Sequence, residues 1–112
     1  MATFSAARLS GPVQLSTTDS QVITAVPAGE FRVVKQLLFT NVTGSPVTVD
    51  ANLVPSGGSV TAANKIISAL SVGANSNIIF SVDLPMAVGE TLTAKASAVT
   101  SVNLVISGIV IS

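Results

Sequence analysis

The chain has 112 residues, the size of one ordinary domain, and it balances five basic against five acidic side chains. It contains no cysteine and no histidine, which excludes disulfides and thiolate metal sites and removes the commonest general base. With only 9% charged residues and no net charge, the chain lacks the positive field that attracts phosphate backbones. We therefore expect no nucleic-acid partner.

Residues 1–11 show no clear hydrophobic period, and we expect them to form an N-terminal arm. Its apolar side chains, Phe4 and Leu9, would cover a surface of this subunit or of another. The arm has one arginine and no apolar core, so it does not read as a secretory signal.

Strands are predicted for the remainder, 12–112, because β-branched residues dominate and turn signals recur about every ten residues. The predicted strands are 13–16, 21–26, 31–41, 47–54, 65–72, 77–84, 90–97 and 102–111. The stretch 61–70 also fits a helical stripe, but we favour a strand with one helical turn at its start. The predicted fold class is all-β: a single antiparallel β-sandwich, jelly-roll-like, of about eight strands with a short N-terminal arm.

Two of the predicted strands, 31–41 and 102–111, are apolar on both faces. A sandwich buries only one face of each sheet, so the second face must be covered by the arm, a loop or another subunit; a closed small barrel is the alternative. In 31–41 the alternation places Val34 and Leu38 on the second face, opposite Val33. The predicted interface residues are Phe4, Leu9, Val34, Leu38, Val105, Ile109 and Ile111.

Composition also favours association. Hydrophobic residues make up 48% of the chain although charges are sparse, and such a chain tends to associate unless its apolar surface is already covered. A stable monomer coated with serine and threonine is the alternative. The most apolar stretch, 102–111, is about half as long as the ~20 residues that a membrane-spanning helix needs, so we expect no membrane partner.

The stretch LVPSGGSVTAAN (53–64) raises the possibility of a phosphate-binding loop. Such a loop needs G-x-x-x-x-G-K-[ST] between a strand and a helix. Here Lys65 lies seven residues beyond Gly58 and no strong helix follows, so we favour a connection between strands. The sequence NVT at 41–43 matches a glycosylation sequon, but we expect Asn41 to serve the turn before Gly44.

No catalytic, cofactor or metal site is predicted. Nucleophilic serine needs a base and an orienting group, but the chain has no histidine and no Ser-x-x-Lys spacing. The five acidic residues lie far apart in sequence, without the close alternating spacing of a calcium loop. We therefore expect a protein that is not an enzyme.

Several turn motifs occur together in this chain. They are Val26-Pro27-Ala28-Gly29, Asn41 with Thr43-Gly44, Val54-Pro55 with Gly57-Gly58-Ser59, Ala63-Asn64, and Gly89-Glu90 with Ala94. As a set, spanning about residues 22–97, they resemble a recurrent type of small tailed-bacteriophage virion protein.

This resemblance implies a β-sandwich virion component present in many copies, and it carries over no catalytic residue or cofactor. The short chain favours a capsid decoration (cement) protein on the capsid surface over a tail, baseplate or fibre part. Such proteins typically sit as homotrimers over capsid junctions and bind the major capsid protein. A glycan-binding tail or fibre module is the alternative, although the chain has no Trp or Tyr to form a sugar platform.

Overall fold

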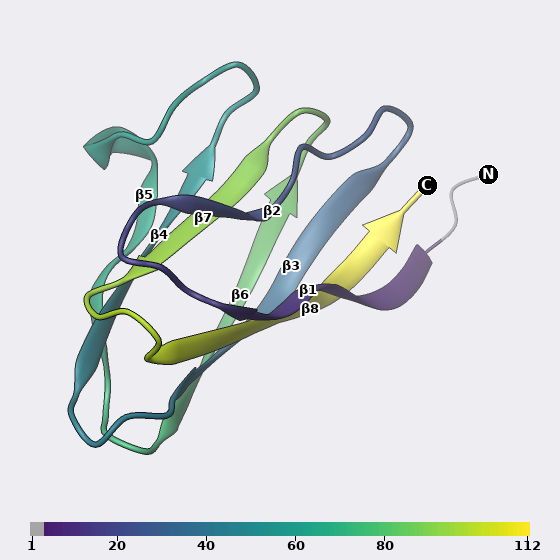
Figure 1. The fold of residues 1–112 in the computed structure, drawn as a ribbon. Helices are drawn as coiled ribbons and strands as arrows, with labels where there is room; N and C mark the ends of the chain where they lie inside the picture. Colours follow the sequence, from purple (N-terminus) through teal and green to yellow (C-terminus); the bar gives the residue numbers. More distant parts are fainter. Residues whose placement is uncertain (1–3) are drawn as a thin grey trace.

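Eight strands form two four-stranded antiparallel sheets that pack face to face (Figure 1). The strands are β1 (Phe4–Gln14), β2 (Ser20–Ile23), β3 (Phe31–Asn41), β4 (Val47–Val54), β5 (Lys65–Val72), β6 (Asn77–Met86), β7 (Thr91–Ala96) and β8 (Val102–Ile111). The computed structural model describes residues 4–112, and none of the helical structure in that range is long and apolar enough to cross a membrane. The predicted all-β sandwich is confirmed.

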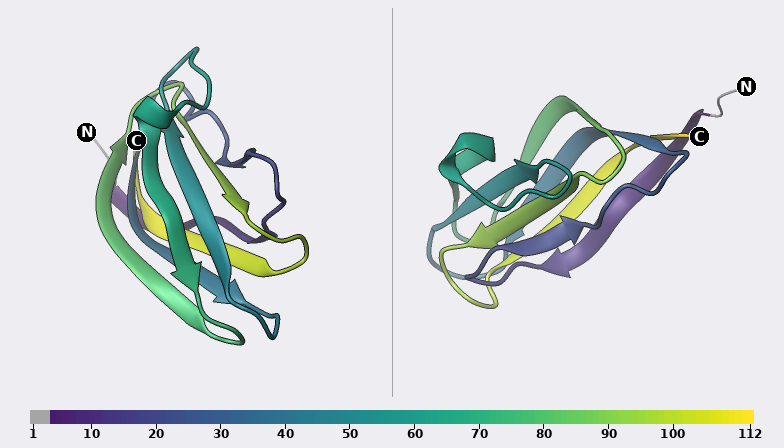
Figure 2. Two further views of the ribbon diagram at one scale, coloured as in Figure 1. Left: turned by 90° about the vertical axis from the view of Figure 1, so that its left-hand side faces the viewer. Right: turned by 90° about the horizontal axis from the view of Figure 1, so that it is seen from above.

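The order of the strands is that of a jelly roll. The first sheet runs β1-β8-β3-β6 and the second runs β2-β7-β4-β5. Each strand of the first half therefore pairs with its counterpart from the second half: β1 with β8, β2 with β7, β3 with β6 and β4 with β5. This is one long antiparallel hairpin wrapped around a sandwich. As Figure 2 shows, the start of β1 lies beside the end of β8, where Phe4 pairs with Ile111.

The core lies between the two sheets, because alternate residues of each strand point inward. Leu37 and Phe39 of β3 are completely buried, as are Leu104 and Ile106 of β8. Leu92 of β7 lies in the same cluster on the opposite sheet. Burying a side chain of this size contributes about 1.5–3 kcal/mol, so these positions account for much of the stability of the sandwich.

Residues 4–11 form most of β1 and are not an arm, which corrects the sequence prediction. They pair along β8, and Leu9 packs against the core of its own subunit. The alternation that would have revealed this strand is broken twice, because the pairing shifts between Arg8 and Ser10 and again between Ser10 and Val13. Residues 1–3, the remainder of the predicted arm, lie outside the described residues.

The other boundaries agree closely with the sequence pattern. The bounds of β3, β4, β5 and β8 match the predicted ranges, while β2 is shorter and β6 extends to Met86. A single 3-10 turn, η1 (Ala62–Asn64), precedes β5. The prediction of one helical turn followed by a strand is therefore confirmed for this segment.

Gly108 of β8 permits a close approach between β8 and β3. A Cβ atom at this position would overlap the carbonyl oxygen of Val33 and would lie 3.0 Å from Leu9 Cδ1. We expect Gly108→Ala to lower the free energy of unfolding by about 1–3 kcal/mol, because the strands must move apart. Urea denaturation measures this difference.

Gly44→Ala is the matched control for this experiment. A Cβ on Gly44 meets no heavy atom within 4 Å, so its free energy of unfolding should change by less than about 0.5 kcal/mol. Equal stabilities of the two variants would show that β8 and β3 do not approach each other as described.

Candidate functional site

The outward face of the first sheet is formed by residues that alternate with the core residues. Because Leu104 and Ile106 are buried, Val105 and Ile109 of the same strand point away from the core. Cross-strand pairing continues this face over the neighbouring strands in register. The orientation of β8 therefore identifies which residues of β1, β3 and β6 share its outward side.

Three apolar rows cross this face, and we call them together the outer apolar face. The first row is Ile79, Leu38 and Val105. The second row is Pro85, Val33, Ile109 and Ala6. The third row is Phe31, Ile111 and Phe4.

The outer apolar face is accessible in the single chain. Ile79 is 55% exposed, Phe31 40% and Phe4 69%, while Leu38 and Val105 are half-buried. Single exposed hydrophobic residues are ordinary on protein surfaces, but contiguous apolar surface commonly marks an interaction site. The second and third rows adjoin each other and form a contiguous surface of this kind, while a row of polar residues separates the first row from them.

A polar row lies between the first and second apolar rows. It consists of Arg8, Ser107, Gln36 and Ser81. Beside Ser81, at the shift in pairing between β3 and β6, Lys35 and Asp83 form an ion pair. Arg8 is exposed and makes no ion pair within residues 4–112. The face therefore carries a free cation at its β1 edge and a carboxylate at its β6 edge.

Five of the seven residues predicted for an interface lie together on the outer apolar face: Phe4, Leu38, Val105, Ile109 and Ile111. The other two point elsewhere, because Leu9 packs on the core and Val34 is completely buried within it. That this shared face is an interface is a prediction.

The position of Val34 is a correction with a clear cause. Between Val34 and Gln36, β3 advances by two residues while β8 advances by one, from Gly108 to Ser107, so Lys35 is an extra residue opposite β8 and the alternation of β3 inverts there. Val33, and not Val34, therefore shares the outward face with Leu38. The lysine inside an apolar run was the available signal for this irregularity.

Sequence reasoning missed Ile79 and Pro85 on β6. A local signal was available for Ile79, because in the run NIIFSVDL it alternates with apolar residues and shares its side with Asn77, Ser81 and Asp83. That pattern places Ile79 outward, and its pairing with Leu38 agrees. Which residues Ile79 meets on the face depends on the partner strand, which is distant in sequence.

The outward face of the second sheet is polar and is partly covered by the loop 55–64. Asn52 of β4 holds this loop, since its Nδ2 donates to the carbonyl oxygen of Thr61 and to Oδ1 of Asn64, each at 2.8 Å. The amide of Gly58 donates to the carbonyl oxygen of Pro55 at 2.8 Å. The glycine pair therefore forms a turn, and the predicted connection between strands is confirmed.

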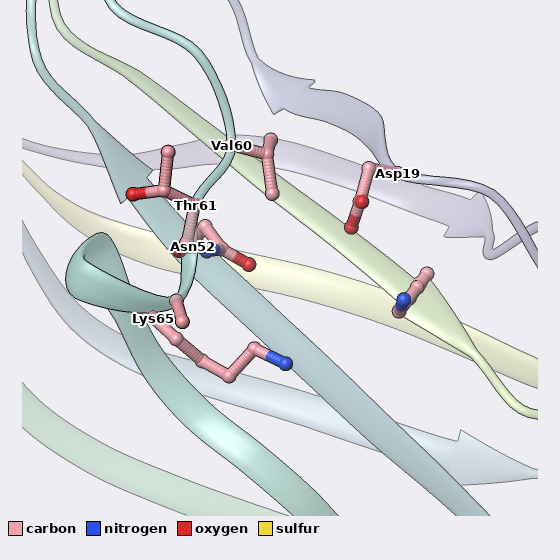
Figure 3. A pocket seen from close by; sticks show the side chains of 7 residues that line it. Asp19, Asn52, Val60, Thr61 and Lys65 are labelled. Atoms are coloured by element: carbon pink, nitrogen blue, oxygen red, sulfur yellow. Dashed lines mark hydrogen bonds between the residues drawn. The ribbon is translucent and has the colours of Figure 1, made fainter.

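A recess of about 190 Å³ lies beside this loop (Figure 3). It is lined by Asp19, Asn52, Val60, Thr61, Ala62, Lys65 and Lys95. Lys65 Nζ lies 3.7 Å from Asp50 Oδ1, and Lys95 is the register partner of Asp50. The charges of two lysines and two aspartates thus cancel around the recess. Its volume is smaller than the ~300–1,000 Å³ of typical small-molecule sites.

Two buried oxygens lie beneath the same region. Asn52 and Thr93 are register partners on β4 and β7, and each keeps one side-chain oxygen without a hydrogen-bond partner among the described residues. Both atoms are closed off from solvent, so they offer no accessible binding group. No cluster of three acidic side chains suited to a metal ion occurs within residues 4–112.

Asn41 serves the turn after β3, as predicted. It is 1% exposed, and its Nδ2 donates to the carbonyl oxygens of Ser45 and Val72 at 2.8 and 3.1 Å. Its Oδ1 accepts from the backbone amide and the hydroxyl of Thr43 at 2.9 and 2.7 Å. The amide of the sequon is therefore enclosed within the turn.

Comparisons with known proteins bear on the fold. No protein-family model matches the sequence, and no curated protein matches it. A chain of infectious bursal disease virus, Gx strain, has a TM-score of 0.59 at 13% identity, covering 100% of this chain and 32% of the viral chain. The infectious bursal disease virus VP2 subviral particle gives 0.51 at 12% identity, covering 98% and 32%.

A third similar structure comes from Bacillus endospore appendages, described as disulfide-linked pili. Its TM-score is 0.58 at 16% identity, covering 98% of this chain and 88% of that one. At such identities the similarity concerns the fold alone. The present chain spans about a third of the length of the viral chains that it matches.

The assignment of Val34 and Val33 to opposite faces predicts opposite responses to the same substitution. Val34→Thr places a hydroxyl in the core and should lower the free energy of unfolding by about 1–3 kcal/mol. Val33→Thr faces outward and should change it by less than about 0.5 kcal/mol. Urea denaturation at low protein concentration checks both, and a larger loss for Val33→Thr would contradict the shifted register.

Proposed function

We propose that this chain is a structural virion protein without enzymatic activity, which works by burying its outer apolar face against other protein chains. The observation that carries the proposal is the set of three registered apolar rows on the first sheet. An antiparallel sheet that meets water on one side alternates apolar and polar residues. Here three rows on the side facing away from the core are apolar, although two polar rows, at Ser107 and at Asn103, lie beside them.

Contact through this face is favoured over contact through strand edges. An exposed strand edge can pair with another chain unless it is irregular, short or interrupted by proline. The pairing of β1 shifts twice, β2 has four residues, and β6 carries Pro85. In β5, Ala69 adopts a positive φ of 51°. Each edge strand thus has a feature that opposes strand addition.

Within this role, the chain is proposed to be a capsid decoration protein. It would form a homotrimer on the capsid surface and bind the major capsid protein. The turn motifs that resemble small phage virion proteins support this, and so does the fold shared with chains of infectious bursal disease virus. Each large apolar side chain buried at a contact contributes about 1.5–3 kcal/mol, and many sites on one shell add avidity.

A tail, baseplate or fibre component is the second candidate. The similarity to a pilus chain over 88% of its length favours an assembly of this elongated kind. Because this chain has no cysteine, its copies could not be joined by disulfides. A glycan-binding role has less support, since the recess on the second sheet is small and has no aromatic side chain in its lining.

The copy number and the position of the protein in the particle test the proposal. Hundreds of copies on the head, seen by quantitative mass spectrometry and electron cryomicroscopy, are expected of a decoration protein. A few copies near the tail would reject decoration and favour the second candidate. The absence of the protein from purified particles would contradict a virion role.

Binding to the shell should depend only weakly on salt, because only 9% of the residues are charged and the net charge is zero. We expect the dissociation constant to change by less than about threefold between 50 and 200 mM salt, a range over which binding through many ionic contacts weakens by about 10³ or more. Isothermal titration with purified shells measures it. A steep loss of affinity with salt would contradict burial of apolar area as the mechanism.

Ile79→Ser and Val88→Ser form a matched pair of variants for the same titration. Val88 is 50% exposed and Ile79 is 55% exposed, so neither substitution should disturb folding. Only Ile79 lies on the outer apolar face, whose burial between copies supports avid binding to the shell, so only its variant should weaken binding, by about tenfold or more. Equal weakening by both would place the contact elsewhere.

A further inference from the structure

We propose that a second copy of this chain covers the outer apolar face, with Arg8 of one copy facing Asp83 of the next. The inference rests on the proposed function, which requires that this face be buried, and it adds which surface joins the copies and how they are arranged. The copies would be related by a rotation axis that runs along the strands. The β1 edge of each copy would then lie against the β6 edge of its neighbour.

The charges of the face are placed for such a contact. Arg8 stands on β1 at one end of the polar row, where it pairs in register with Ser107. Asp83 stands on β6 at the other end, beside Ser81. These two strands are the two edges of the first sheet. A cation and an anion at opposite ends of one row can meet only when two different edges come together.

Both groups are available to a neighbouring chain. Arg8 is exposed and has no ion-pair partner within residues 4–112. The Asp83 side chain is 77% exposed, and its ion pair with Lys35 is made through Oδ1. Lys35 lies on β3, one strand further in. A chain that approaches the β6 edge therefore meets the carboxylate before it meets the lysine.

The direction of the rotation axis follows from these positions. A twofold axis running across the strands would place β1 against β1 and bring one Arg8 near the other, and like charges oppose association. An axis along the strands places β1 against β6, whether the ring has two members or three. It also keeps each row at the same height, so that apolar rows meet apolar rows between copies.

Exchanging the charges tests this arrangement, with association measured by analytical ultracentrifugation of the purified protein. Arg8→Glu should weaken self-association by about tenfold or more, because two acidic groups then face each other. The double variant K35E/D83K keeps the ion pair within the chain with its signs reversed, and it presents a lysine to Arg8. It should weaken association to a similar extent.

Combining all three substitutions should restore association to within about threefold of the wild type, since opposite charges face each other again. Lys95→Glu, on the second sheet, is the control and should leave association unchanged. Circular dichroism and the urea midpoint establish that each variant is folded.

Failure of the triple variant to recover would overturn the proposed arrangement, as would single changes without effect. A wild-type protein that stays monomeric at all concentrations would also overturn it, because the partner would then not be a second copy. A monomeric protein would also remove the homotrimer from the proposed function, but neither result decides the virion role, which depends on the copy number in particles and on binding to shells.

Discussion

The register between β3 and β8, the two central strands of the first sheet, determines the rest of the molecule. Because a strand exposes alternate residues on opposite faces, a shift of one residue exchanges the buried and the outward sets. The pairing of Leu37 with Ile106 directs both side chains into the core. The same register directs Leu38 and Val105 outward. The core and the outer apolar face are thus two consequences of one pairing, and neither can change without the other.

The sequence predicted the sandwich and most strand boundaries because turn residues and β-branched runs are local signals. It could not predict the faces reliably, since these depend on pairing between distant segments. Val34 illustrates the difference: the shift at Lys35 inverts the alternation, and the valine lies in the core and not on the surface. Residues 4–11 show the same limit, because two shifts in β1 hide the period of a strand that only its pairing with β8 reveals.

The two sheets differ in how they meet their surroundings. On the second sheet, Asn52 holds the loop 55–64 over the outward face, so this face is partly covered by a loop of its own chain that is hydrogen-bonded to it. On the first sheet, the described residues place no loop over the corresponding face. Because only 9% of the residues are charged, electrostatic repulsion between copies does little to oppose association through this exposed surface. The irregular edges of the sheets then direct association to the face.

The account depends most on whether the outer apolar face becomes buried when the protein assembles. Hydroxyl-radical footprinting of dilute and assembled protein, read by mass spectrometry, measures this residue by residue. The account predicts strong protection of Ile79, Leu38 and Val105 on assembly, with no change at Val88 and Val99, which are exposed in the single chain. Unchanged reactivity on the first sheet, with protection at Val88 and Val99 instead, would contradict it.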